Sequence, residues 1–414
     1  NVTGILVQDS NVSVLDLVCT GKGIPFRVEG SRSVSVLLNA DLESENPLQK
    51  AIDLADGEIY LRNVRTKGYR LPLVKATNCV FFDPYIEEYS TAENRYMLFE
   101  SEGYSLGLPV EDAPEEYEIK CESEIAFVDD YGALGDGISD ATRAIQYAMD
   151  SGKGYIVFGG GHYLVNDTIT VPATVKMIDF MYCDFYAGDK LKNGRQLGFL
   201  KINQDCEAHL VLKNVFTWEK FYGYFRFVEH ACKRDLVMKD LHTQCAGMYF
   251  NTVEGSRVFI ENCACTMGGG DYCTVEPFVF KGQKVWCRNI NPERGDVQIL
   301  NDHSLLWILG MKTESWEERE GTTAVKNTNS GKTECFGVYS GIGGLGVPLY
   351  INENSEMSVF ASTCGYSEKT IWDILVREIR GTEMRELKAK EVFKLSWFRY
   401  RLFGYIGRTG AGYE

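Results

Sequence analysis

Acidic residues recur at a nearly constant interval in the second half of the chain. Asp271, Glu293, Glu314 and Glu334 follow one another in almost equal steps. If the backbone coils with about 21 residues per turn, we expect these side chains to project from neighbouring positions on successive turns. Stacked like charges repel, which favours the protonated form of at least one carboxyl group. A protonated carboxylic acid beside an ionised one is the arrangement that glycoside hydrolysis requires.

Glu314 has the most distinctive surroundings of the four carboxylates. It ends the segment 307–314 (WILGMKTE), with Trp307 at the start of this segment and Trp316 just beyond it. Tryptophan faces stack on the C–H faces of sugars, so the sequence predicts a saccharide site that includes both tryptophans and Asp271. Side chains alternate along a strand, so Trp307 is as readily expected to point into the core as toward a sugar. Trp316 lies among acidic residues and is expected to be exposed.

Two observations favour a structural role for these residues instead. Loops of different length can break the register and leave the carboxylates as solvated surface residues. The triplet KTE at 312–314 also recurs at 332–334, as a packing preference repeated along a stack of turns would produce. We favour Glu314 as a catalytic acid because only this copy of the triplet follows both a Trp and a Gly.

Motifs for other mechanisms are absent from the sequence. There is no HExxH, no GxSxG and no EF-hand loop. The five histidines are not spaced as metal ligands, and the thirteen cysteines are scattered, with Cys263 and Cys265 as the only close pair. We therefore expect no metal, no cofactor and no disulfide scaffold, and most cysteines are expected to be buried as small apolar residues.

The composition indicates a β-rich protein with an uncharged partner. The chain has 41 glycines against 10 prolines, together with 22 Phe and 23 Tyr, which favours a turn-rich β fold. A formal charge of −15 and a pI of about 5.0 argue against a nucleic-acid partner and mildly against polyanionic substrates such as pectate. No apolar run is long enough to span a bilayer, so we expect a soluble protein without a membrane partner.

The block 126–166 indicates the fold most strongly. Residues 131–137 (YGALGDG) form a glycine-rich turn, and Ser139 or Asp140 can cap a short α-helix near 140–151 with one apolar side. Two short strands follow this helix. A phosphate-binding loop is disfavoured because neither GxxxxGK[ST] nor GxGxxG occurs at this position.

This block closely resembles the opening signature of the pectate-lyase-like superfamily, whose members fold as right-handed parallel β-helices. The resemblance implies an all-β solenoid in which the short α-helix plugs the N-terminal end. It also implies that the chain after residue 166 coils into successive turns.

Short β-rich runs on both sides of the block predict two tandem β-helices. Residues 1–105 hold four such runs and form the C-terminal part of a first β-helix, incomplete at its N-terminus, which a missing segment outside this chain would complete. Residues 106–125 form an acidic, proline-containing linker. Residues 126–414 form the second β-helix, with a hairpin turning at Gly381-Thr382 as its C-terminal cap.

The start of the chain carries no targeting information. Asn1 is not an initiator methionine and no signal peptide follows it, which we interpret as processing or truncation. The expected location, extracellular or at the cell surface, therefore rests on the kind of fold alone.

A linker and a plug signature between two β-helical stretches resemble glycoside hydrolase family 55. These twin β-helix enzymes cleave β-1,3-glucans from chain ends with inversion. Their general acid lies in a pattern similar to W-x-x-G-x-x-x-E, which Trp307, Gly310 and Glu314 match, so the resemblance implies Glu314 as the general acid. Ser315 replaces the histidine that often follows in the family.

We therefore predict an inverting glycoside hydrolase that acts on a neutral, β-1,3-glucan-like polysaccharide. Glu293, one turn before Glu314, is the first candidate for the base, with Asp302 and Asp296 as alternatives. Two other functions stay open. One is a polysaccharide lyase of the pectate-lyase type, which needs a cation or basic residues around a uronate. The other is a non-catalytic carbohydrate-binding or tailspike-like solenoid.

Overall fold

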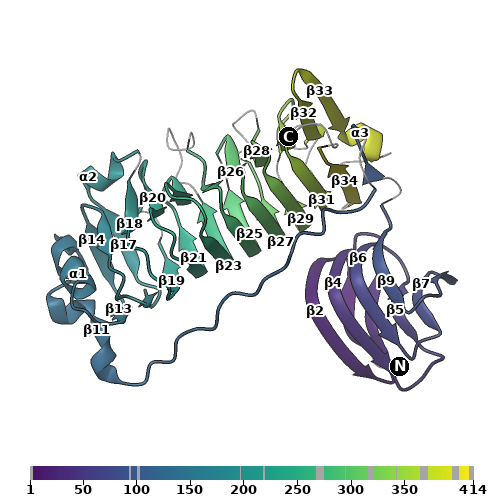
Figure 1. Ribbon diagram of the computed structural model, residues 1–414, viewed down its shortest axis with the longest axis horizontal. Coiled ribbons are helices and arrows are strands. Elements are labelled where there is room, and N and C mark those ends of the chain that lie inside the picture. Colours follow the sequence, from purple (N-terminus) through teal and green to yellow (C-terminus); the bar gives the residue numbers. More distant parts are fainter. Residues whose placement is uncertain are drawn as a thin grey trace.

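The computed structural model describes residues 3–92, 95–99, 103–195, 197–217, 220–266, 275–293, 295–315, 321–341, 343–363, 372–393 and 401–409. In these ranges the chain is all-β apart from three short α-helices and two 3-10 turns. Most strands stack in parallel on successive turns, so the predicted all-β parallel β-helix is confirmed (Figure 1).

The N-terminal part of the chain forms a small solenoid of two sheets. One sheet has the order β1 (Thr3–Gln8), β3 (Ile24–Glu29), β5 (Lys50–Leu54), β7 (Leu71–Lys75), β8 (Asn78–Phe81). The other has the order β2 (Asn11–Gly21), β4 (Val34–Ser44), β6 (Glu58–Lys67), β9 (Tyr85–Ser90). β1 and β2 are edge strands, at the end where the sequence predicts a completing segment.

The last of the four predicted coils in this solenoid, residues 78–89, is not a parallel coil. Its two halves, β8 and β9, pair antiparallel with β7 and β6 respectively. The chain reverses after β7 and then winds in the opposite direction, so both sheets end in an antiparallel strand. Alternating polarity alone cannot distinguish a parallel from an antiparallel neighbour, which explains the error.

The second solenoid contains three sheets. The twelve-stranded sheet has the order β10 (Arg95–Tyr96), β34 (Arg401–Gly407), β31 (Glu356–Thr363), β29 (Lys332–Ser340), β27 (Leu305–Thr313), β25 (Lys284–Glu293), β23 (Arg257–Thr266), β21 (Leu236–Thr243), β19 (Leu210–Phe216), β16 (Met177–Asp179), β13 (Tyr155–Val157), β11 (Ile125–Phe127). The ten-stranded sheet has the order β15 (Ile169–Val171), β18 (Gly198–Ile202), β20 (Arg226–His230), β22 (Gly247–Asn251), β24 (Phe278–Lys281), β26 (Val297–Asp302), β28 (Thr323–Thr328), β30 (Pro348–Glu353), β32 (Ile374–Arg380), β33 (Glu383–Lys388). The third sheet is β12 (Asp136–Asp140), β14 (His162–Val165), β17 (Asp184–Ala187).

Helices and antiparallel strands close the two ends of this solenoid. At the first end, α1 (Thr142–Met149) buries Ile145, Ala148 and Met149 against the core, next to the 3-10 turns η1 (Glu122–Glu124) and η2 (Val128–Tyr131). At the far end, β32 and β33 form an antiparallel hairpin around Gly381, as predicted, and β34 pairs antiparallel with β31. The short helices α2 (Asp189–Lys192) and α3 (Ala389–Val392) lie between strands.

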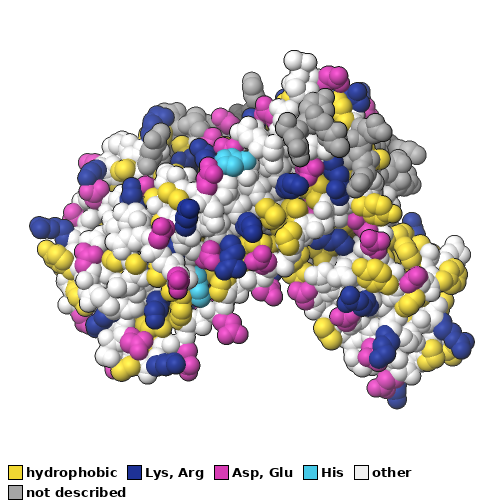
Figure 2. All heavy atoms as spheres, in the orientation of Figure 1, with side chains coloured by type: hydrophobic (Ala, Val, Ile, Leu, Met, Phe, Trp, Pro, Cys, Tyr) yellow, Lys and Arg dark blue, Asp and Glu magenta, His cyan; other side chains and the backbone are white. Residues whose placement is uncertain are grey.

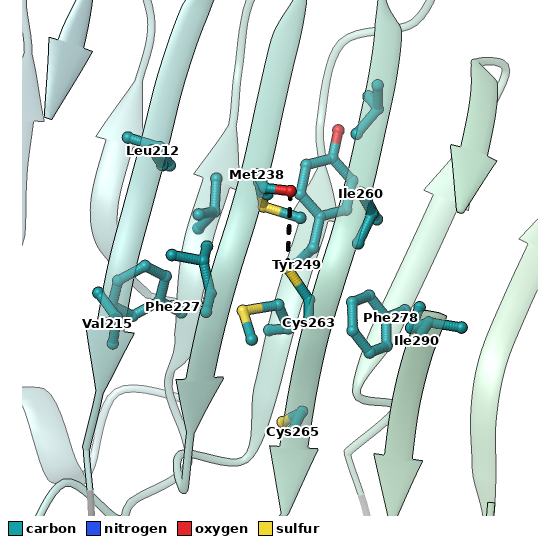
Figure 3. Close-up of a cluster of buried hydrophobic side chains, with 14 of the residues drawn as sticks. Leu212, Val215, Phe227, Met238, Tyr249, Ile260, Cys263, Cys265, Phe278 and Ile290 are labelled. Atoms are coloured by element: carbon teal, nitrogen blue, oxygen red, sulfur yellow. Dashed lines mark hydrogen bonds between the residues drawn. The ribbon is translucent and has the colours of Figure 1, made fainter. Parts of the chain in front are cut away.

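Residues in the same register stack into buried columns inside the second solenoid. Leu212, Met238 and Ile260 are direct neighbours on β19, β21 and β23, and all three are buried (Figure 3). Cys263 and Cys265 are buried free thiols, as predicted, and Cys263 Sγ donates a hydrogen bond to the Met238 carbonyl at 3.6 Å. Because each turn covers the apolar side chains of its neighbours, stability accumulates along the stack.

The linker runs along the outer face of the twelve-stranded sheet (Figure 1). Trp286 Nε1 donates to the Pro109 carbonyl at 2.9 Å, and Glu116 bridges Lys213 and Lys239 at 2.9 and 2.8 Å. The linker therefore covers an apolar stripe that would otherwise face solvent. Basic and acidic side chains are interspersed on the face seen in Figure 2, without one continuous basic patch.

Candidate functional site

Glu293 and Glu314 lie side by side on adjacent turns of the second solenoid. They form an isolated parallel bridge immediately after the paired segments of β25 and β27. Inward-pointing residues on these strands are buried, whereas Glu293 and Glu314 point outward and keep 13% and 28% of their side-chain surface exposed. The sequence interval of one turn therefore places these two carboxylates next to each other.

Lys312 connects the two carboxylates. Its Nζ lies 2.8 Å from Glu314 Oε1 and also contacts Glu293 Oε1, which accepts a further hydrogen bond from Asn291 Nδ2 at 3.1 Å. The ammonium offsets the repulsion between the two carboxylates that stacking alone would produce. Burial lowers the pKa of Lys312, but its hydrogen bonds to Glu293 and Glu314 outweigh burial, so the pKa of Lys312 is raised.

The separation of the two carboxylates is short. Both Oε1 atoms lie within hydrogen-bonding distance of the same nitrogen, so they are less than about 6 Å apart. Inverting glycosidases hold their carboxyl groups about 6.5–9.5 Å apart, whereas retaining enzymes hold them about 5–5.5 Å apart. The spacing thus lies below the inverting range that the sequence resemblance implies.

Glu334 does not continue this ladder, although it follows Glu314 by nearly the same interval as Glu314 follows Glu293. Glu334 lies near the start of β29, where its register partner on β27 is Trp307. Thr313 pairs with Ser340, so the residue that follows the same register beside Glu314 is Gly341. The fully buried Glu334 carboxylate accepts hydrogen bonds from Arg62 Nη1 at 2.9 Å, from the Gly107 and Leu108 amides at 2.9 and 3.1 Å, and from Ser358 Oγ at 3.2 Å. Glu334 therefore joins the first solenoid, the linker and the second solenoid.

Trp307 is not available to a sugar, so its predicted role in substrate binding is wrong. Its side chain is fully buried and packs in one cluster with Trp286 and Phe336, beneath Leu108 of the linker. The ring points away from the solenoid core, but the linker and the first solenoid cover that outer face. Trp316 and Asp271, the other predicted substrate contacts, lie outside the described residues.

Gly310 has a backbone role that accounts for its place in the WxxGxxxE pattern. Its φ of 74° is left-handed, and it occupies the same register as Asn289 on β25. The whole column is left-handed and consists of Asn214, Asp240, Asn262, Asn289, Gly310 and Gly337. Gly310 thus bends its strand as the other members of the column bend theirs, since Asn, Asp and Gly tolerate this conformation best.

Asp302 lies at the wrong edge of the solenoid to be the base. Asp302 is the last residue of β26, and β26 begins just after the turn that follows Glu293. The strand is about 16 Å long at ~3.3 Å per residue, so its full length separates Asp302 from that turn. The Asp302 carboxylate accepts hydrogen bonds from His303 Nδ1 at 3.0 Å and Asn329 Nδ2 at 2.7 Å. Burial raises the pKa of Asp302, but these two bonds outweigh burial and lower it. Asp296 is exposed in the turn between β25 and β26, on the same edge as Glu293.

A cleft of about 670 Å³ on the ten-stranded sheet is a feature that the sequence analysis missed. Phe250, Val279 and Leu300, which are register neighbours on β22, β24 and β26, line this cleft. Its charged lining consists of Arg226, Glu229, Glu254, Glu276 and Lys281. No motif marks these residues, because only the stacking of four turns brings them together.

Ion pairs fix the charged groups around the cleft. Arg226 bonds Glu276 at 3.1 Å, with its guanidinium carbon 5.1 Å from the centre of the Phe250 ring. Glu229 pairs with Lys201 at 2.6 Å, and Glu254 pairs with His303 at 3.1 Å. Glu276 precedes β24, on the edge that also carries Glu293 and Glu314. Glu254 and Lys281 lie at the opposite edge, where Lys281 pairs with Asp302. The cleft thus runs across the sheet, and neither Glu293 nor Glu314 lines it.

Neither a metal site nor a membrane-spanning helix is found in the part of the chain that the structure describes. No group of three or more His, Cys, Asp or Glu side chains in these ranges could hold a metal ion. No helix within them has the length and hydrophobicity to cross a bilayer.

Comparisons with known proteins agree with the fold. Residues 126–179 match the family model described as "Rhamnogalacturonase A/epimerase, pectate lyase-like". No curated protein sequence matches the chain at a significant level.

Three solved structures are similar to this chain at low sequence identity. ORF18 of Geobacillus virus E2 is 14% identical with a TM-score of 0.36, over 60% of this chain and 62% of the virus protein, so this chain spans less than two thirds of that protein. A candidate glycosyl hydrolase from Parabacteroides merdae is 13% identical with a TM-score of 0.25, over 60% of this chain and 98% of that one. PfbA, a surface adhesin of Streptococcus pneumoniae, is 10% identical with a TM-score of 0.17, over 67% and 99%. Residues 126–179 thus match a pectate-lyase-like family model, and the chain that follows them folds as a parallel β-helix.

Proposed function

We propose that this protein is a carbohydrate-active enzyme that hydrolyses glycosidic bonds of a neutral polysaccharide, with Glu314 and Glu293 as its two carboxylates. The observation that carries the proposal is the parallel bridge that sets Glu293 beside Glu314 on the outer face. Two partly exposed carboxylates within about 6 Å of each other are the minimum equipment for this chemistry.

The two carboxylates differ in ways that suit different roles. Glu293 is the more buried and is held by Asn291 and Lys312, which suits a nucleophile that attacks the anomeric carbon. Glu314 is the more exposed and suits the acid that protonates the leaving oxygen and then activates water. We expect Lys312 to move toward Glu293 when substrate binds, because Glu314 must carry a proton to act as the acid. The short spacing makes retention of configuration the expected outcome.

The cleft on the ten-stranded sheet suits an uncharged, hydroxyl-rich chain. Phe250 supplies an aromatic face, and Arg226 and Glu276 neutralise each other beside it. Glu229 and Glu254 supply further acceptors for hydroxyl groups. A β-1,3-glucan is the first substrate to test, because the resemblance to glycoside hydrolase family 55 implies it.

A polysaccharide lyase is less well supported. Such an enzyme needs a basic side chain that can accept a proton from the sugar ring. Lys312 is the basic residue at the carboxylate pair, and its contacts with Glu293 and Glu314 raise its pKa, so it stays protonated at neutral pH. A protonated lysine cannot act as a general base.

A non-catalytic carbohydrate-binding solenoid is the second candidate. It is favoured by the ion pairing of Lys312 with both carboxylates, since cross-turn Lys–Glu pairs also occur where no cleft is present. Lys326 and Glu353, for example, pair at 3.0 Å between β28 and β30.

The experiment compares wild-type protein with three variants on β-1,3-glucan and on panels of other neutral and uronic polysaccharides. Wild type should release reducing ends from a neutral polymer, and Glu314→Gln and Glu293→Gln should each lower kcat by about 10²–10⁴-fold. Glu353→Gln is the matched control, since Glu353 is similarly exposed and lysine-paired, and it should keep full activity. Undiminished hydrolysis by Glu314→Gln would exclude Glu314 as the acid. Products absorbing in the ultraviolet would indicate a lyase, and binding without cleavage by any variant would indicate the non-catalytic candidate.

A further inference from the structure

A second cavity, of about 360 Å³, lies where the linker meets the first solenoid. It is separate from the cleft on the ten-stranded sheet and shares no lining residue with it. Strands β4, β6 and β9 contribute Asn39, Asn63, Tyr85 and Glu87, and the segment just before the linker contributes Tyr104. Nothing in the predicted chemistry of Glu314 requires this cavity.

Two stacked asparagines form one wall of the cavity. Asn39 and Asn63 have left-handed backbones, with φ of 53° and 54°, at the same register of β4 and β6. Asn63 Nδ2 donates to Asn39 Oδ1 at 2.9 Å. Within the described part of the chain, this bond leaves Asn39 Nδ2 as a donor and Asn63 Oδ1 as an acceptor for a ligand. A paired amide donor and acceptor can bind two neighbouring hydroxyl groups at once.

Two tyrosines stand at the mouth of the cavity. Tyr85 and Tyr104 are 43% and 58% exposed, so part of each side chain faces solvent. The guanidinium of Arg65 lies 5.8 Å from the centre of the Tyr85 ring. Aromatic rings at a polar cavity provide the flat apolar surface on which the C–H faces of sugars pack.

The floor of the cavity is held by an ion pair and by partly buried hydrogen bonds. Arg62 is fixed by Glu334, and Ser105 donates through both its amide and its hydroxyl to Glu88, at 3.1 and 2.8 Å. Because Arg62 is already ion-paired, it does not attract an anion strongly. Glu87 and Glu88 instead make the cavity repel carboxylates, phosphates and sulfates.

We propose that this cavity binds a neutral saccharide of one or two sugar rings, through the Asn39–Asn63 amides and the faces of Tyr85 and Tyr104. The site is not catalytic and does not depend on the proposed hydrolysis. It would hold a polysaccharide on the first solenoid while the second solenoid engages the same or another chain.

The test is isothermal titration of the full chain with laminarihexaose, cellohexaose, mannohexaose and chitohexaose, with hexagalacturonate as the acidic comparison. All variants carry Phe250→Ala, which removes the aromatic face of the other cleft. At least one neutral hexasaccharide should bind, and Tyr104→Ala or Asn63→Leu should weaken it about tenfold, as expected for one lost stacking or amide contact. Tyr85→Phe should keep the affinity. Tyr147→Ala, at an equally exposed tyrosine on α1, should have no effect.

Three results would overturn the proposal. The first is that no neutral hexasaccharide binds, the second is that neither Tyr104→Ala nor Asn63→Leu changes binding, and the third is preferential binding of hexagalacturonate. Failure of the proposed function is distinguishable, since Glu314→Gln should abolish hydrolysis and leave these titrations unchanged.

Discussion

Lys312 is the residue on which the electrostatics of the proposed site depend. It is 38% exposed and contacts both Glu293 and Glu314, so it keeps two adjacent carboxylates compatible with a folded, ionised site. The raised pKa of Lys312 means that its contribution to stability is fully present below its unfolded pKa of about 10.4 and is lost as the pH rises through the higher folded pKa.

Lys312→Met should therefore lower the free energy of unfolding at pH 7, by about 1 kcal/mol or less because the site is partly exposed. The loss of stability above about pH 10.4 that wild type shows should be smaller in this variant, because the raised pKa of Lys312 is its source. Urea unfolding at pH 7 and above about pH 10.4 measures both effects, with Lys326→Met, which also loses a lysine–glutamate pair, as the control. The same loss of stability above about pH 10.4 in wild type and Lys312→Met would contradict this account.

His230 provides a second pH-dependent contribution, from the interior of the solenoid. Its Nδ1 lies 2.8 Å from Tyr249 Oη, and its buried Nε2 has no hydrogen-bond partner in the described ranges. Burial lowers the pKa of His230 to about 4, so the residue is neutral in the folded protein.

Acidification from about pH 6.5 to about pH 4 should thus reduce the free energy of unfolding by on the order of 3 kcal/mol, because the unfolded chain binds a proton in this window and the folded chain does not. His230→Gln should lose this part of the pH dependence, whatever its stability at pH 7. His162→Gln, at a half-exposed histidine, should keep it. Equal pH slopes for wild type and His230→Gln would show that His230 is protonated in the folded state.

At the scale of the strands, the length of each turn decides which sequence predictions hold. The turn from Lys284 to Leu305 is as long as the interval from Glu293 to Glu314, so these two carboxylates fall into register as the sequence predicts. The next turn, from Leu305 to Lys332, is longer than the interval from Glu314 to Glu334, so Glu334 falls short of the position beside Glu314. The difference arises from turns outside the strands, whose lengths carry no register signal in a single sequence.

The left-handed column makes Gly310 a sensitive position within β27. A Cβ at Gly310 would make only ordinary contacts with Asn289, so the cost of substitution comes from the backbone conformation. We expect Gly310→Ala to lower the free energy of unfolding by about 1–2 kcal/mol. Gly310→Asn should cost less, because it continues the column of Asn262 and Asn289, whose side chains hydrogen-bond at 2.8 Å.

Thermal or urea unfolding of the two Gly310 variants, with wild type, measures this difference. Gly132→Ala, at a left-handed glycine outside the column with open space around its Cβ, is a suitable control for backbone strain alone. Equal destabilisation by Ala and Asn at position 310 would show that the column does not stabilise the turn.

At the scale of the whole molecule, the linker and the first solenoid hide what the second solenoid alone would expose. Local sequence patterns predicted the parallel stack, the plug helix α1 and the hairpin of β32 and β33, because each of these elements is defined by residues close together in the sequence. The burial of Trp307 depends on residues far earlier in the chain, such as Leu108, and the cleft depends on four turns meeting. Neither follows from local periodicity.

The buried pair of Arg62 and Glu334 should control how the two solenoids unfold. Arg62→Met leaves the fully buried Glu334 without its charge partner, which typically costs about 3–5 kcal/mol, although the Gly107 and Leu108 amides keep the cost near the lower end. We expect the unfolding transition to divide into two, as the first solenoid loosens before the second.

Arg401→Met is the control for this prediction. Arg401 also bridges the solenoids, by pairing with Glu58 at 2.8 Å, but it is 49% exposed and its loss should cost about 1 kcal/mol or less. Calorimetry of the three proteins distinguishes the cases. A single unshifted transition in Arg62→Met would mean that the pair does not couple the solenoids.

The anomeric configuration of the first product released from a β-linked glucan tests the central claim most directly. Glu293 and Glu314 lie less than about 6 Å apart through their shared contact with Lys312, a spacing that fits a covalent intermediate and leaves no room for an attacking water between them. Proton NMR of the earliest product, before mutarotation, should show the β-anomer, and Glu314→Gln should release none. Accumulation of the α-anomer, or an unchanged rate in Glu314→Gln, would contradict the assignment of this carboxylate pair.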